Sequence, residues 1–178
     1  GVTGSKGKST TASLIYEILK TAGRDVRLVG NIGEPAIAHI SKANEGVLFV
    51  LEMSSFQLMD LTTSPQIAVI TSLFPEHLDY HGSLEAYKEA KANIARFKEC
   101  SVCIYHESTK ELVEGSSADC ISYSEADSPV TLSETELLGT HNISNIAGAC
   151  KVTRHLGIPE DVILNTIKTF QGLPHRLQ

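Results

Sequence analysis

The sequence has no long apolar run, no dense basic run and no charged-then-apolar leader segment. A membrane-spanning helix needs about 20 consecutive apolar residues, and no stretch of the 178 residues approaches that length. The 15 Lys and Arg against 21 Asp and Glu give a net charge of −6, which argues against broad nucleic-acid binding because phosphate backbones select basic surfaces. We therefore expect a soluble, cytoplasmic protein with no nucleic-acid partner and no membrane span.

Cysteine is scarce, with four residues in the chain, and this number fits a reduced cytosolic protein better than a disulfide scaffold of this length. Cys100 and Cys103 form a CxxC pair, but no second pair accompanies them. The surrounding "SVCIY" alternates as a strand does. We therefore predict a packed strand here rather than a zinc or redox site.

With 42% hydrophobic and 20% charged residues, the chain has the composition of one globular domain that buries its own core. Continuous apolar runs rich in β-branched residues alternate with helical patterns, which predicts an α/β fold with a mostly parallel sheet flanked by helices. The expected strands are 26–30, 47–52, 67–74, 102–105 and 120–123, and the clearest helices are 8–22, 83–98, 142–156 and 159–170. The polar segment 124–140 predicts a loop or a short hairpin.

The chain opens on a glycine-rich loop, "GSKGKST", at residues 4–10. Its two glycines let backbone amides turn toward an anion, and the following helix adds the positive end of its dipole. Lys8 can then reach outer phosphates and Ser9 can ligate magnesium, so we predict nucleoside triphosphate binding rather than a plain exposed loop. Val2 stands where the standard pattern has glycine. Such a loop normally follows a buried strand, which we expect to be missing here. The candidate phosphate-binding residues are Gly4, Ser5, Lys6, Gly7, Lys8, Ser9 and Thr10.

Polar residues follow several expected strands, at the edge where parallel sheets bind ligands. Glu52 ends the strand 47–52, and a carboxylate there predicts a second magnesium contact, with a capped or solvated Glu as the alternative. Loop 75–81, "PEHLDYH", contains His77, whose imidazole could ligate a metal or bond a substrate, although the loop could equally be ordinary surface. Asn31 lies between two glycines and either contacts a ligand or forms a simple turn.

Lys91 lies on the apolar stripe of its predicted helix, together with Tyr87 and Ile94. An ammonium group is unusual at such a position. From the residues alone, the favoured interpretation is a lysine stem that covers apolar surface while its head stays in water.

These residues together resemble the central domain of the Mur ligases, and within that family the branch that adds D-glutamate. The motifs "TGSKGKST", "GNIG", "LEMSSFQL", "HLDYH", "YKEAK", "HNISN" and "GLPHR" occur in the order that the family uses. The first is shared with folylpolyglutamate synthetases, whereas "SSFQL" and "GLPHR" look specific to the D-glutamate-adding branch. Thr71-Ser72 and Glu76 depart from the common Thr-Asn and Asp of the family.

The resemblance implies an α/β central domain of the P-loop NTPase type over residues 1–171, and a linker at 172–178 toward a C-terminal domain that is absent here. It implies that Lys8 holds phosphates of ATP, that Ser9 and Glu52 bind one magnesium ion, and that His77 and a carbamylated Lys91 bind metal in a site for two ions. Burial would favour the carbamate, since it lowers the pKa of a lysine and the reaction with carbon dioxide needs a neutral amine. It further implies substrate contacts by Asn31, Ser54 and His77, adenine contacts by Asn142 and Asn145, and an ATP contact by Arg176.

The implied reaction joins D-glutamate to UDP-N-acetylmuramoyl-L-alanine at the expense of ATP, through an acyl phosphate, in peptidoglycan synthesis. The expected state is a monomer, and the 178 residues alone are expected to be inactive because the flanking domains of the family are absent. Two alternatives stay open: a ligase of the folylpolyglutamate type or another Mur ligase, and a P-loop switch that forms no amide bond.

Overall fold

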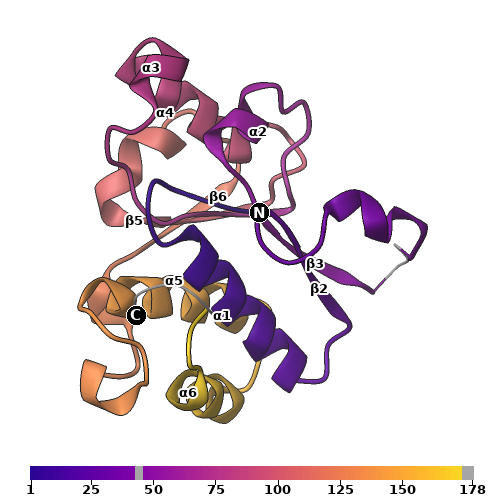
Figure 1. The fold of residues 1–178 in the computed structure, drawn as a ribbon, viewed down its shortest axis with the longest axis vertical. Coiled ribbons are helices and arrows are strands. Elements are labelled where there is room, and N and C mark those ends of the chain that lie inside the picture. Colours follow the sequence, from indigo (N-terminus) through magenta and orange to yellow (C-terminus); the bar gives the residue numbers. More distant parts are fainter. Residues whose placement is uncertain (43–45, 174–178) are drawn as a thin grey trace.

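The computed structural model describes residues 1–42 and 46–173, with the backbone alone for residues 40–42. Its centre is a six-stranded sheet in the order β2-β3-β1-β4-β5-β6, and every strand pairing is parallel (Figure 1). The α/β fold with a parallel sheet is thereby confirmed. The strands are β1 (Val2–Thr3), β2 (Val26–Gly30), β3 (Leu48–Glu52), β4 (Ile67–Ile70), β5 (Val102–His106) and β6 (Asp119–Tyr123).

Helices cover both faces of the sheet, and each face has its own apolar core (Figure 1). On one face α1 packs against α5 and α6, and on the other α2 packs against α4. This two-sided burial is the physical reason for the continuous apolar strands in the sequence. The helices are α1 (Lys8–Thr21), α2 (Ser55–Met59), α3 (Leu78–His81), α4 (Leu84–Ala92), α5 (His141–His155) and α6 (Glu160–Thr169). Among the described residues, no helix is both long enough and apolar enough to cross a membrane.

A two-residue strand precedes the glycine-rich loop, where the sequence analysis expected none. β1 lies in the middle of the sheet, with Val2 in register with Glu52 of β3 and with Val69 of β4. The Val2 carbonyl accepts from the Met53 amide at 2.9 Å, and the Thr3 carbonyl accepts from the Thr71 amide at 2.9 Å. Two residues are too few for a periodic pattern, so only pairing with both neighbours reveals the strand.

Other differences from the prediction are local. The helix expected at 83–98 ends at Ala92 and continues as a 3₁₀ turn, Asn93–Ala95, and the strand expected at 67–74 ends at Ile70. The segment 124–140 is a loop with two short 3₁₀ turns, which agrees with the first of the two predicted alternatives. The short helices α2 and α3 were not predicted, because fewer than six residues carry no readable helical period.

Candidate functional site

The glycine-rich loop joins the end of β1 to the start of α1, at the carboxyl edge of the sheet. Gly4 and Gly7 have positive φ values of 150° and 85°. A Cβ atom on Gly4 would lie 2.1 Å from the Thr71 hydroxyl oxygen, and one on Gly7 would lie 2.2 Å from the Asn145 side-chain oxygen. Both positions therefore need glycine for conformation and for space.

The loop is held by the segment that follows β4. The Ser5 amide donates to the Ser72 carbonyl at 2.9 Å, and the Lys6 amide donates to the Ser72 hydroxyl at 2.8 Å. The helix α1 begins after Gly7 without a side-chain cap, so its first-turn amides have no intrahelical partner. A braced loop that leads into an uncapped helix N-terminus has the chemistry of an anion site.

Two lysine amino groups converge on one backbone carbonyl of the loop. Lys8 Nζ donates to the Gly4 carbonyl at 3.0 Å and to the Ser5 carbonyl at 2.8 Å, and Lys91 Nζ donates to the same Gly4 carbonyl at 2.8 Å. The two nitrogens thus lie no farther apart than the sum of the two distances to Gly4. One ligand group placed beside the loop could contact both lysines.

Lys91 is buried, with 1% of its surface exposed, so the interpretation in which its head stays in water is wrong. Its Nζ lies 4.8 Å from the centroid of the Tyr87 ring. Burial and then the charge of Lys8 lower the pKa of Lys91 to about 7, against an opposing effect of Glu76. A substantial share of this amine is therefore neutral near pH 7, which is the form that acts as a nucleophile.

Glu52 ends β3 directly beside β1 and is 3% exposed. Its Oε2 is buried and has no hydrogen-bond partner among the described residues. A buried carboxylate oxygen without a partner is costly unless a cation meets it, so this side chain fits a bound metal ion. Ser9, which is 1% exposed in the first turn of α1, adds a hydroxyl near the same edge.

His77 is exposed and adopts a left-handed backbone conformation, with φ of 56°, at the start of α3. Its ring centroid lies 5.1 Å from that of Phe56. Its neighbour His81 bonds to the Ser55 hydroxyl at 3.0 Å through Nε2, and burial, then His77 and Lys91, lower the pKa of His81. The histidine loop thus faces the side of the site that holds Lys91. Within the described ranges, no group of three or more His, Cys, Asp or Glu side chains is placed to hold a metal by itself.

Two further predicted residues, Ser54 and Asn31, have hydrogen bonds within the chain, and a third lies outside the described residues. Ser54 is the N-cap of α2, and its hydroxyl accepts from the Gln57 amide at 3.3 Å in a capping box. Asn31 is exposed, and its backbone amide donates to the Glu52 carbonyl at 3.2 Å. Arg176 lies outside the described residues.

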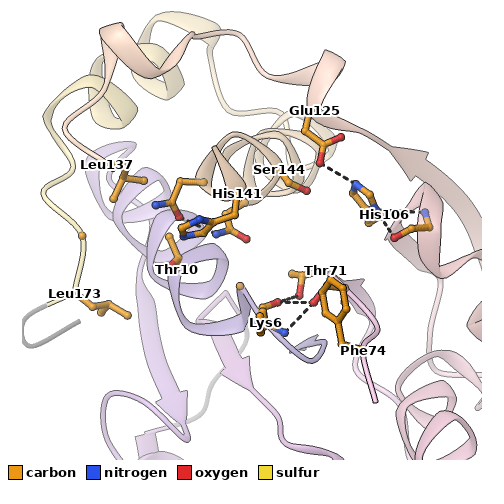
Figure 2. Close-up of a pocket in the computed structure, with 16 residues that line it drawn as sticks. Lys6, Thr10, Thr71, Phe74, His106, Glu125, Leu137, His141, Ser144 and Leu173 are labelled. Carbon is orange, nitrogen blue, oxygen red and sulfur yellow. Dashed lines mark hydrogen bonds and ion pairs between the residues drawn. The ribbon is translucent and has the colours of Figure 1, made fainter. Parts of the chain in front are cut away.

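A cavity of about 610 Å³ opens beside the loop, at the N-terminal ends of α1 and α5 (Figure 2). Its lining includes Lys6, Gly7 and Thr10 from the loop and α1, and Asn142 and Asn145 from α5. The Asn145 side-chain amide donates to the Asn142 side-chain oxygen at 2.8 Å, so the two residues form one polar unit on α5. The volume lies in the range of small-molecule sites.

Sequence reasoning missed several residues of this site. Tyr87 is one, although it lies four residues before Lys91 on the same helix face; its hydroxyl lies 2.8 Å from the Ser5 hydroxyl. Ser72 was seen only as a departure from a family pattern, and His106 and Glu125, which line the cavity, were not singled out. No spacing in the sequence links residues that come from the ends of different strands.

The sequence and the fold are similar to those of known proteins. Residues 2–132 match the family model of the Mur ligase middle domain. A UDP-N-acetylmuramoylalanine--D-glutamate ligase of Streptococcus pyogenes is 36% identical over 202 aligned residues; the alignment covers 100% of this chain and 44% of that protein. The chain therefore spans less than half the length of this relative.

Solved structures share the fold. A UDP-N-acetylmuramoyl-L-alanyl-D-glutamate--2,6-diaminopimelate ligase superposes with a TM-score of 0.79 at 23% identity, covering 99% of this chain and 47% of that one. FolC of E. coli, in complex with DHPP and ADP, superposes with a TM-score of 0.67 at 19% identity, covering 99% of this chain and 57% of that one. At these identities the likeness concerns the fold alone. The sequence match over most of its length shows that this chain belongs to the Mur ligase family, as a middle domain.

Proposed function

We propose that this chain is the ATP-binding part of a ligase that joins D-glutamate to UDP-N-acetylmuramoyl-L-alanine and forms ADP and phosphate. The observation that carries the proposal is the convergence of Lys8 and buried Lys91 on the Gly4 carbonyl of the glycine-rich loop. At the next strand end lies Glu52 Oε2, which has no hydrogen-bond partner in the part of the chain that the structure describes. The name of the 36% identical relative supports the choice of D-glutamate.

The residues present fit ATP and magnesium, which the Mur ligase family uses. The positive φ values of Gly4 and Gly7 let the loop turn tightly into α1, and the amides at the start of α1 suit the phosphates. Lys8 would neutralise the outer phosphates. Glu52 Oε2 and the Ser9 hydroxyl would hold the first metal ion, which would stabilise charge on the transferred phosphoryl group when bound.

We further propose that Lys91 is carbamylated and serves, with His77, a second metal ion. The buried amine with its lowered pKa supports this, because carbon dioxide adds to a neutral amine to form a carbamate and release one proton. The product is an anion that attracts a cation, whereas an ammonium would repel it.

The proposed chemistry begins with transfer of the γ-phosphoryl group of ATP to the L-alanine carboxylate. The amine of D-glutamate then attacks this acyl phosphate, and phosphate leaves. The difficulty of the first step is the approach of two anions, and Lys8 lowers this repulsion from the protein side. Contacts of Asn31, Ser54 and His77 with the muramoyl substrate, of Asn142 and Asn145 with adenine, and of Arg176 with ATP remain part of this proposal. So do the linker role of 172–178, a monomeric state and a cytoplasmic location.

The test uses a full-length enzyme that contains this chain, supplied with ATP, UDP-N-acetylmuramoyl-L-alanine and one amino acid at a time. We expect phosphate release that depends on both the nucleotide substrate and D-glutamate, and release that is lost in Lys8→Ala. Release that ignores D-glutamate but responds to another acceptor would favour a different ligase of the superfamily, such as the folylpolyglutamate type. Release without any acceptor would favour a P-loop switch.

A further inference from the structure

One end of the cavity beside the loop carries a polar cluster that the proposed function does not use. His106 is the last residue of β5, Ser108 follows it, Glu125 follows β6, and Ser144 lies on α5. Figure 2 shows the His106 and Glu125 side chains joined across the ends of the two strands, with Ser144 beside them. Lys6 and Gly7 of the glycine-rich loop line the same cavity.

The hydrogen bonds of the two His106 ring nitrogens fix the orientation of the ring. The Ser108 amide donates to His106 Nδ1 at 3.3 Å, so Nδ1 is an acceptor and the proton of the neutral ring is on Nε2. His106 Nε2 then donates to Glu125 Oε1 at 3.3 Å. The ring also packs edge-on against Tyr123, with centroids 5.4 Å apart. His106 is therefore held on three sides and can orient the carboxylate.

Among the described residues that line this cavity, Glu125 is the only one with a carboxylate. About half of its side chain, 56%, stays exposed, so a ligand can reach it. Its own backbone amide, and then His106 and Ser144, lower the pKa of the Glu125 carboxyl, which keeps it ionised near neutral pH. An ionised carboxylate only accepts hydrogen bonds, and it repels phosphate.

We infer that Glu125, positioned by His106, accepts hydrogen bonds from the ribose hydroxyls of the bound nucleotide. The inference rests on the proposed function, because it assumes that the phosphates lie on the glycine-rich loop. With the phosphates there, the nucleoside extends into the cavity, and its hydroxyls are the donors that an anionic acceptor suits. A carboxylate that binds ribose hydroxyls is established chemistry in other nucleotide-binding folds. His106 acts through Glu125 and is a positioning residue.

The test compares the affinity of the 178-residue chain for ATP and for 2′,3′-dideoxy-ATP, which lacks both hydroxyls, by isothermal titration. We expect the wild type to prefer ATP at least about tenfold, as for hydrogen bonds to a charged group. Glu125→Ala should reduce this ratio to about one, and His106→Ala should reduce it partly. Glu107→Gln, an exposed neighbour outside the cavity lining, is the matched control and should keep the wild-type ratio.

An unchanged ratio in Glu125→Ala would overturn the inference while leaving ATP binding intact. Inosine triphosphate provides a further arm: if Glu125→Ala alters the preference for ATP over inosine triphosphate but not over the dideoxy nucleotide, Glu125 contacts the base and the inference is wrong. Absence of binding for every nucleotide would instead overturn the proposed function, and the inference with it. Circular dichroism and thermal unfolding of each variant check that the fold is retained.

Discussion

Replacing Lys91 with methionine should stabilise this chain, and more strongly at pH 6 than at pH 9. Burial and the charge of Lys8 lower the pKa of Lys91 from 10.5 to about 7 in the folded state. Between these two values the unfolded chain binds more protons at this side chain, so the wild type gains stability as the pH rises through the window. Below pH 7 the full cost of a buried ammonium is present.

The magnitude follows from the same two pKa values. By the linkage relation, the contribution of Lys91 to the unfolding free energy of the wild type increases by about 2 to 3 kcal/mol between pH 6 and pH 9. Methionine has no proton to bind, so its advantage over the wild type should shrink by that amount. The lost hydrogen bond to the Gly4 carbonyl costs about 1 kcal/mol at either pH and leaves the slope unchanged.

Urea unfolding followed by circular dichroism, in buffers purged of carbon dioxide, measures this difference at pH 6, 7.5 and 9. Lys98→Met, at an exposed position, is the control and should change stability equally at each pH. A Lys91→Met difference that stays constant across these pH values would refute the reasoning, since it would mean that Lys91 has an ordinary pKa. Added bicarbonate should stabilise the wild type and leave Lys91→Met unaffected, if the carbamate forms.

Three further changes test the site. Gly7→Ala should weaken ATP binding at least about tenfold, because the new Cβ would collide with the Asn145 side chain of α5. Gly115 is the control: it has a similar φ of 86° but open space around it, so Gly115→Ala should lower stability without affecting the ATP affinity measured by calorimetry. Glu52→Gln should leave ATP binding without magnesium unchanged and remove the gain that magnesium gives, and a retained gain would contradict its assignment as a ligand. Ser54→Ala should lower the unfolding free energy by about 1 kcal/mol through loss of the α2 cap, and a loss of activity without this change in the melt would show that the substrate contact dominates.

Much of the fold could be predicted because its cause is local. Buried parallel strands must be apolar on both faces, so they are visible in the sequence as apolar runs such as 26–30 and 102–105. The glycine-rich loop was predictable for the same reason, since positive φ values at Gly4 and Gly7 demand a residue without a Cβ. Glu52 could be named as a candidate from the sequence because it ends a strand, and all strands of a parallel sheet end at one edge.

The state of Lys91 depended on tertiary structure. A helical stripe places a lysine on the apolar face, but it does not say whether the amine reaches water. The carbonyl that the buried amine binds belongs to Gly4, 87 residues earlier in the chain. The pKa of the amine follows from that packing, not from its position on the helix.

By itself, then, the sequence determined the layer architecture, the loop and the strand ends, because periodicity, backbone conformation and chain direction are properties of neighbouring residues. Only the folded chain decided which side chains share a cavity. The pairing of β5 with β6 places His106 opposite Tyr123, and Glu125, two residues after Tyr123, therefore comes within hydrogen-bond distance of His106. Pairing between segments depends on the burial that the whole sheet provides, and no local pattern records it.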